Sequence, residues 1–170
     1  MEFFVRSAEI WPCPCCQGAL APYGRRSRVQ VLGTGEVRRL LVRRLRCNSC
    51  RRVHHELPAE LVPYKRYAAA SIEQALHQRQ TLDVAADEST LGRWRRWFGW
   101  WAPYACGCLE MLGHRLAIHA RASSAPLHAA LCGLGRYVGD APGWLPRVVR
   151  PLAHAHLWPT TRSAWVASAS

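Results

Sequence analysis

The chain of 170 residues can form one medium domain or two small ones, and its apolar fraction of 49% is ordinary for a folded protein. Its 23 lysine and arginine residues against 11 acids give a formal charge of +12, which favours a polyanionic partner, either nucleic acid or an anionic membrane surface. A basic surface that is merely solvated is the plain alternative. Residues 1–10 lack a signal-peptide pattern, and the most apolar stretch, 97–109, is too short and too broken by Pro103 to span a bilayer. We therefore expect no membrane partner and a soluble intracellular chain, in which paired cysteines bind metal rather than form disulfides.

Two Cys-x-x-Cys pairs lie in the first third of the chain, Cys13/Cys16 and Cys47/Cys50. Each pair has the spacing of a zinc knuckle, and four thiolates complete a closed tetrahedral site. The stretch 23–32 is rich in β-forming residues, turn residues follow, and 37–46 predicts a second strand that returns to the first knuckle. We predict a zinc ribbon over residues 1–57 with one structural Zn²⁺ that supplies much of its folding free energy. The alternative is a small core in which the Cys-x-x-Cys pairs are incidental.

The ligand set has two open points. Cys15 lies inside the first knuckle and competes with Cys13 or Cys16, although the spacing favours these two. His54 and His55 follow the second knuckle and could replace a cysteine, but we expect them to be surface histidines on an exit strand.

The predicted hairpin is dense in arginine and has a single acid, Glu36. Arginine makes bidentate contacts to phosphate that lysine cannot make, so we expect these side chains to contact a nucleic-acid backbone. Residues 58–67 form a linker in which Pro58 and Pro63 prevent a continuous helix. Its basic residues either follow a phosphate backbone or tether a packed linker. The candidate contacts from both segments are Arg25, Arg26, Arg28, Arg43, Arg44, Arg46, Lys65 and Arg66.

Residues 68–100 have the pattern of three short helices: one near 71–79, one over 82–86, and one that Ser89 caps and that runs through Phe98. We predict a helix-turn-helix whose last helix turns Leu91, Trp94 and Phe98 inward. Its exposed side chains would enter the major groove of double-stranded DNA, and ordinary helical packing is the alternative. The candidate groove contacts are Thr90, Arg93 and Arg96, and Trp97 is also expected on the surface.

Residues 101–170 are apolar and helical in composition, with tryptophans suited to a core or an interface. The predicted fold class is therefore α+β: a ribbon with two cysteine knuckles, then a mostly helical region that contains the helix-turn-helix. Cysteines and a histidine in this region do not have knuckle spacing, so we do not expect a second metal site at Cys106, Cys108, His114 and Cys132.

These motifs together resemble a family of small uncharacterised bacterial proteins that are often found near mobile elements. The resemblance covers nearly the whole chain, and the linker is its most specific part. It implies zinc binding and DNA binding linked to transposition or its regulation. One departure is the CPCC sequence in place of a knuckle with two cysteines only. The matching segments are Cys13, Cys16, Cys47 and Cys50, then Leu61–Tyr67, Ser89–Phe98, Gly143–Val149, Leu157, Trp158 and Thr161–Ala164.

We expect no enzyme and no catalytic residue. A transposase core needs several carboxylates around two metal ions, and beyond Glu88 the chain has only Glu110 and Asp140. No phosphate loop, HExxH motif or nucleophile elbow is present. RNA binding is a third possibility, which the hairpin arginines would serve, but the chain lacks the exposed aromatic stacking motifs of the known RNA-binding modules.

The predicted function is zinc-dependent DNA binding in the cytoplasm, associated with the nucleoid. The alternative is a zinc-ribbon adaptor that joins a transposase without reading DNA sequence. The choice between a homodimer and a transposase as protein partner stays open.

Overall fold

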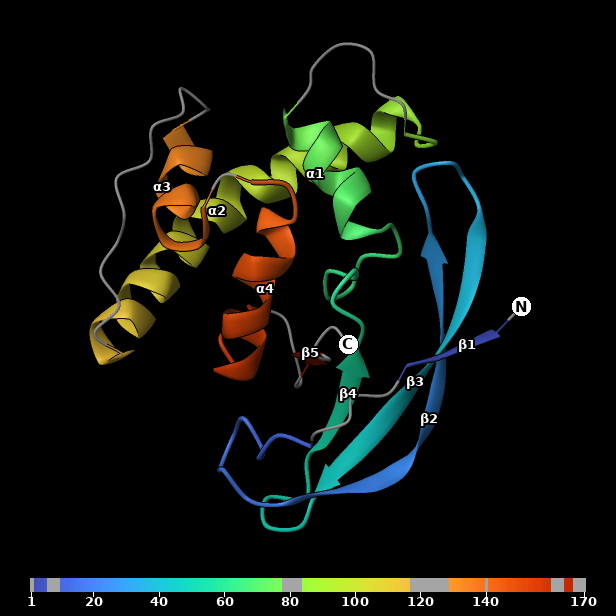
Figure 1. Ribbon diagram of the computed structural model, residues 1–170, viewed down its shortest axis with the longest axis vertical. Helices are drawn as coiled ribbons and strands as arrows, with labels where there is room; N and C mark the ends of the chain where they lie inside the picture. The colour runs from blue at the N-terminus through green and yellow to red at the C-terminus, as the bar shows by residue number, and fades with distance from the viewer. Residues whose placement is uncertain are drawn as a thin grey trace.

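The computed structural model describes residues 2–5, 10–77, 84–116, 129–139, 141–159 and 164–166, and the side chains of most of them. A five-stranded sheet lies on one side of the molecule and the helices lie on the other (Figure 1). The predicted α+β class is confirmed.

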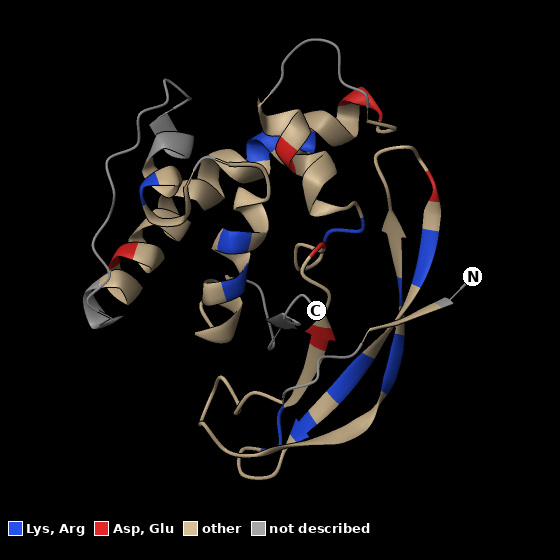
Figure 2. Ribbon diagram, viewed as in Figure 1, with Lys and Arg blue, Asp and Glu red and all other residues tan. Residues whose placement is uncertain are grey.

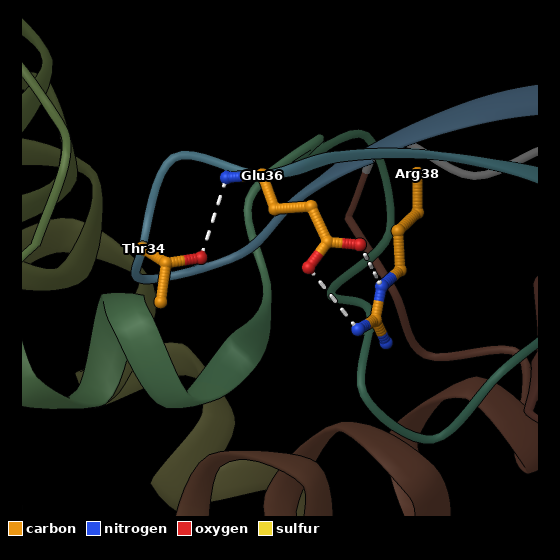
Figure 3. A network of polar contacts seen from close by, with 3 residues as sticks. All are labelled: Thr34, Glu36 and Arg38. Atoms are coloured by element: carbon orange, nitrogen blue, oxygen red, sulfur yellow. Dashed lines mark hydrogen bonds and ion pairs between the residues drawn. The ribbon is translucent and has the colours of Figure 1, made fainter.

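Two long strands, β2 (Leu20–Val31) and β3 (Val37–Cys47), form an antiparallel hairpin that is the spine of the sheet. They match the predicted strands closely, because runs of β-forming residues lie on both sides of the turn at 32–36. Figure 3 shows this turn: the backbone N–H of Glu36 donates to Thr34 Oγ1 at 3.3 Å, and Arg38 pairs with the Glu36 carboxylate. Gly35 has φ 86°, which glycine adopts without strain. The exposed ion pair orders the turn more than it stabilises the fold.

The short strands complete the sheet along the other edge of β3. Strand β1 (Glu2–Val5) runs parallel to the first half of β3, and β4 (Val53–Leu57) runs antiparallel to its second half. Strand β5 (Ala164–Val166) then adds to β4 in parallel. The second knuckle therefore connects two paired strands, which holds it at one end of the sheet.

Four helices form the second layer: α1 (Ala69–His77), α2 (Glu88–Leu116), α3 (Ala129–Val138) and α4 (Trp144–His154). Trp101 is fully buried at their centre, where its ring stacks on Trp97 at 4.9 Å and lies 5.3 Å from Trp158. The Glu73 carboxylate of α1 accepts hydrogen bonds from the N–H groups of Gly143 and Leu145, so it caps the start of α4. Among the described residues, one apolar core thus joins the four helices.

The helical predictions are right about the inward face and wrong about several boundaries. Leu91, Trp94 and Phe98 are buried as expected, but Trp97 is buried too. The cap of α2 is Asp87 rather than Ser89, since Asp87 Oδ1 accepts the N–H of Thr90 at 2.6 Å.

The predicted helix over 82–86 is wrong for residues 84–86, which have no helical conformation; 82 and 83 lie outside the described residues. The physical reason is that the N–H of Ala85 donates to the carbonyl of Gly33 in the hairpin turn at 2.9 Å. This bond ties the segment before α2 to the ribbon.

Helix α2 continues past Phe98 to Leu116, through Pro103. It therefore spans residue 100, where a domain boundary was expected, and the same core contains buried residues from both sides. In the part of the chain that the structure describes, no helix is long and apolar enough to cross a membrane.

Candidate metal centre and basic surface

The two knuckles have the same backbone geometry. In the first, the N–H of Cys13 donates to the carbonyl of Gly18 and the N–H of Gln17 to that of Cys13. In the second, the N–H of Cys47 donates to the carbonyl of Arg52 and the N–H of Arg51 to that of Cys47. Gln17 and Arg51, each directly after the last cysteine of its knuckle, have φ 59° and 62°. This repeated left-handed residue turns each chain so that its two sulfurs face one point.

Close backbone packing brings the two knuckles together. The N–H of Asn48 donates to the carbonyl of Ala19 at 3.0 Å. A Cβ on Gly18 would lie 2.5 Å from Ser49 Oγ and 3.1 Å from Cys47 Sγ, so any other residue would have to displace Ser49 and crowd a ligand sulfur. The small residue at position 18 therefore lets the two knuckles pack closely enough for their sulfurs to meet.

The four predicted ligand sulfurs all lie within 4.8 Å of one another. Cys13 Sγ is 3.6 Å from Cys50 Sγ, and Cys16 Sγ is 3.5 Å from Cys47 Sγ. A tetrahedral zinc with Zn–S bonds of about 2.3 Å needs sulfur–sulfur separations of roughly 3.8 Å, close to these values. The described cysteines are free thiols. The four cysteines are thus placed to hold one metal ion, as the sequence predicted.

The local environment prepares part of this set for metal binding. Burial opposes ionisation of Cys47, but the backbone N–H groups of Cys50 and Ser49 and the neighbouring thiols outweigh it and lower its pKa to about 6. The N–H of Cys50 points at Cys47 Sγ from 3.4 Å. Burial raises the pKa of Cys13. A bound cation would stabilise both thiolates, because metal ligands bind deprotonated.

His54 differs from the sequence expectation. It is fully buried rather than on the surface, and its Nε2 lies 3.3 Å from Cys13 Sγ. The cause is register: His54 pairs with Leu45 and shares its inward face. Burial, helped by nearby positive charge, lowers its pKa to about 4, so the ring is neutral at pH 7.

Cys15 lies near Cys13 and His54, and these three also form a compact ligand group. The guanidinium of Arg52 donates to Cys15 Sγ at 3.4 Å, which supplies a positive neighbour to that thiol. His54 and Cys15 therefore both lie beside Cys13, at one side of the four-sulfur site. His55, on the opposite face, is half-buried.

Arg43 is another residue that the structure places differently. It was expected at the surface, but its side chain is only 10% exposed and it makes a bidentate ion pair with Glu56, at 2.6 and 3.0 Å. Glu56 is fully buried on β4. Arg43 therefore holds the sheet together, and its charge is neutralised within the fold.

The other hairpin arginines lie at or near the surface of the strands. Arg25 and Arg26 are exposed, whereas Arg28, Arg44 and Arg46 are half-buried. Figure 2 shows the basic residues as bands along β2 and β3, with few acids beside them. The expected basic surface of the ribbon is therefore present without Arg43.

The linker connects this surface to α2. Arg28 donates to the carbonyl of Lys65 at 3.1 Å, and the ammonium of Lys65 lies 4.5 Å from the centre of the Trp97 ring. Burial, then the charge of Arg93, lowers the pKa of Lys65. Arg66 is exposed. Lys65 thus contacts both the hairpin and α2 in addition to carrying a positive charge, and it brings the hairpin arginines close to those of α2.

The predicted groove contacts of α2 divide into two kinds. Arg93 and Arg96 are exposed. Thr90 is buried, contrary to expectation, because it lies in the first turn against the core, where its Oγ1 accepts a 2.6 Å hydrogen bond from Arg93. Thr90 orients Arg93 and does not itself face solvent.

Two exposed tyrosines beside the predicted contacts were not among the predicted site residues, although the sequence-level mixture of aromatic and basic residues at 64–67 suits a phosphate backbone. Tyr23 is 50% exposed between Arg44 and Arg46, and Tyr64 is 62% exposed in the linker. The available signal was their position: each is an aromatic residue within two positions of arginine or lysine in a segment with few acids.

Residues 13–94 match the model of a family described as Domain of unknown function (DUF6431). The match begins at the first ligand cysteine and ends within α2, so it includes both knuckles, the hairpin and the linker. No match was found among curated proteins or among solved structures. The family description names no activity, so any function rests on the geometry above.

Proposed function

We propose that this protein is a zinc-dependent binder of double-stranded DNA. The observation that carries the proposal is the continuity of the basic surface: Arg28 of the hairpin donates to the carbonyl of Lys65, and Lys65 lies over Trp97 of α2, the helix that carries Arg93 and Arg96, although these segments are far apart in sequence. Four thiolates at tetrahedral spacing favour Zn²⁺ over hard cations such as Mg²⁺, which prefer oxygen ligands. The zinc would keep the hairpin rigid so that its arginines hold fixed positions along a phosphate backbone.

In this proposal the two regions have different tasks. The exposed and half-buried arginines of β2 and β3 contact phosphates, which supplies affinity without sequence information. Arg93 and Arg96 project from the first turns of α2 as the groove-reading element of a helix-turn-helix-like unit. From the resemblance, the biological setting that we propose is transposition or its regulation.

The test is selection of random duplex DNA by the zinc-loaded protein, with binding repeated over a salt series. We expect an enriched motif and an affinity that falls steeply with salt, with a slope of roughly −0.9 per phosphate contacted. Absence of duplex binding at moderate salt would overturn the proposal.

Variants of α2 test the groove-reading part. Arg93→Ala with Arg96→Ala should weaken binding by about 1–3 kcal/mol for each base that is no longer read, and should relax the motif. Arg136→Ala is the matched control, since Arg136 is an exposed arginine on α3. If the control weakens binding equally, the effect is one of net charge and the groove assignment fails.

A second candidate is a protein adaptor. Trp100 and Tyr104 lie one turn apart on α2 and are 54% and 40% exposed, which is the kind of aromatic pair that anchors a protein interface. Light scattering would detect a homodimer, and Trp100→Glu should convert it to a monomer without weakening DNA binding by an isolated protomer. A monomer at all concentrations would remove this support for self-association.

A further inference from the structure

One face of the ribbon interleaves aromatic rings with positive charge. Residues paired across an antiparallel ladder lie on the same face, so Arg26 opposite Val42 and Arg28 opposite Leu40 share a face with Arg44 opposite His55. The ring of Tyr23 joins this face through its contacts to Arg44 and Arg46. Tyr64 directly precedes Lys65, whose carbonyl accepts a hydrogen bond from Arg28. We name this the aromatic–basic face; its members are Tyr23, Arg26, Arg28, Arg44, Arg46, His55 and Tyr64.

Tyr23 occupies an irregular position at one end of this face. The pairing register between β2 and β3 shifts between Pro22 and Gly24, so Tyr23 is the extra residue of a β-bulge. The guanidinium carbons of Arg44 and Arg46 lie 5.1 and 5.4 Å from its ring centre. Half of the side chain is nevertheless exposed. The bulge therefore presents an aromatic ring to solvent with two cations held against it.

Tyr64 occupies the other end in a strained backbone conformation. The N–H of Lys65 donates to the carbonyl of Val62 at 3.0 Å and closes a turn with Pro63 second and Tyr64 third. Tyr64 has φ 62°, where the third position of such a turn favours glycine or asparagine. A non-glycine residue there costs of order 1 kcal/mol. The side chain is 62% exposed, so burial does not offset this cost.

Acids are scarce on the strands that build this face. The described side chains of β2, β3 and β4 include one acid, Glu56, which is neutralised by Arg43 on the opposite face, and Glu36 in the turn is paired with Arg38. His55 is half-buried and neutral, since burial and then Arg26, Arg44 and Arg28 lower its pKa. The face is thus positively charged along its length.

The extent of the face suits several nucleotides. Arg44 and Leu40, the residues of β3 beside its two ends, are four positions apart, or about 13 Å at the rise of a β-strand. Exposed rings at the two ends, with cations between them, match the way in which proteins hold single strands: bases stack on aromatic side chains and arginines follow the phosphates. A duplex keeps its base faces stacked inside, so it cannot use either tyrosine in this way.

We infer that the aromatic–basic face binds an unpaired segment of DNA, with bases stacked on Tyr23 and Tyr64 and phosphates on the arginines between them. The inference rests on the proposed function, because it assigns a single-stranded part of the same DNA to the ribbon. Arg93 and Arg96 on α2 remain the residues that read the groove of the duplex.

The experiment compares binding of the full-length, zinc-loaded protein to a labelled oligothymidylate of about ten nucleotides and to a duplex, by fluorescence anisotropy. Tyr23→Ala and Tyr64→Ala should each weaken single-strand binding about 5- to 100-fold and change duplex binding less than about twofold. Tyr23→Phe and Tyr64→Phe should keep single-strand affinity, because the ring remains. Phe4→Ala is the matched control: Phe4 is 47% exposed and pairs with Leu41, on the opposite face.

Tyr64→Gly separates binding from folding. Glycine adopts φ 62° without strain, so the thermal midpoint should not fall, yet single-strand affinity should drop as it does for Tyr64→Ala. A loss of affinity in a variant that is no less stable cannot come from unfolding.

Three results would overturn the inference. The first is duplex binding without single-strand binding, which leaves the proposed function intact. The second is an equal loss in Phe4→Ala and Tyr23→Ala, and the third is tighter binding of an RNA strand than of the DNA strand of the same sequence. Failure to bind either form of DNA would instead remove the proposed function, with the inference that rests on it.

Discussion

The ribbon and the helical layer are stabilised by different means. The helical layer has one apolar core built around Trp97, Trp101 and Trp158. The described residues of the ribbon form two small clusters, one around Leu20 and Leu45 beside the knuckles and the other under the linker. Burial of apolar area stabilises the first region, whereas the second has too little of it to fold alone.

This difference arises because the ribbon has fewer apolar side chains to bury than the helical layer has. A two-stranded hairpin is marginal by itself, and much of the outward surface of β2 is arginine. Since those side chains must stay solvated, stability has to come from cross-links: the metal site at one end and the Arg43–Glu56 pair in the middle. The comparison predicts that each region can be weakened without the other.

The largest effect is expected from loss of the metal. Chelation, or Cys47→Ser, should unfold the ribbon, because binding of a structural zinc contributes on the order of 10 kcal/mol. The helical layer should keep its structure. Hydrogen exchange resolved by segment measures this directly: rapid exchange over β2, β3 and β4 with slow exchange retained in α2 and α4.

The control is Cys15→Ser, which removes a thiol next to the site but none of the four sulfurs that face one another. It should bind one equivalent of metal with little change in stability. Slow exchange retained over the ribbon after metal removal would refute the structural role of the site.

The converse change acts on the helical core. Trp101→Ala removes a fully buried ring and should destabilise the protein by about 3–5 kcal/mol while metal stoichiometry stays at one. Among the described residues none accepts a hydrogen bond from Trp101 Nε1. Trp101→Phe should therefore cost much less, since it also removes a buried donor without a partner. Denaturant unfolding followed by far-ultraviolet circular dichroism checks both variants.

The buried ion pair is expected to have an effect of about 3 kcal/mol. Arg43→Ala leaves the Glu56 carboxylate buried without its guanidinium, and this uncompensated charge is the cost. The double change Arg43→Met with Glu56→Leu should recover most of the stability, because it removes both charges and keeps the volume. Equal destabilisation by the single and double variants would mean that packing, not charge, dominates at this site. Unfolding free energies of the three proteins decide between these.

The same contrast explains what the sequence could predict. Cysteine spacing, turn residues and β-forming runs are local signals, so both knuckles and both long strands were predicted within a few residues. Leu91, Trp94 and Phe98 were placed correctly for the same reason, since helical periodicity is local.

The errors arise where partners come from far along the chain. Arg43 resembles its neighbouring arginines until the register of β4 brings Glu56 beside it. Residues 84–86 are not helical because Ala85 bonds to the hairpin turn about fifty residues earlier. Thr90 is buried because the core covers the first turn of α2. None of these contacts can be predicted from the residues that are neighbours in the sequence.

His54 gives the most delicate test of the comparison, because it belongs to both kinds of stabilisation: it is buried, and it touches the metal site. A neutral ring carries one N–H, and on Nε2 that group can donate to Cys13 Sγ at 3.3 Å. Outer-shell donors of this kind typically change metal affinity 10- to 100-fold, so His54→Ala should weaken zinc binding by that factor in a competition with a chromophoric chelator. His54→Gln keeps an N–H donor and should recover part of the lost zinc affinity.

The cobalt(II) spectrum of His54→Ala should keep the intensity of four thiolate ligands. A gain of thiolate-to-cobalt intensity relative to the unchanged protein, or a new ligand-field pattern, would instead make His54 a ligand in place of one cysteine, and the stability of the ribbon would then depend on a mixed site.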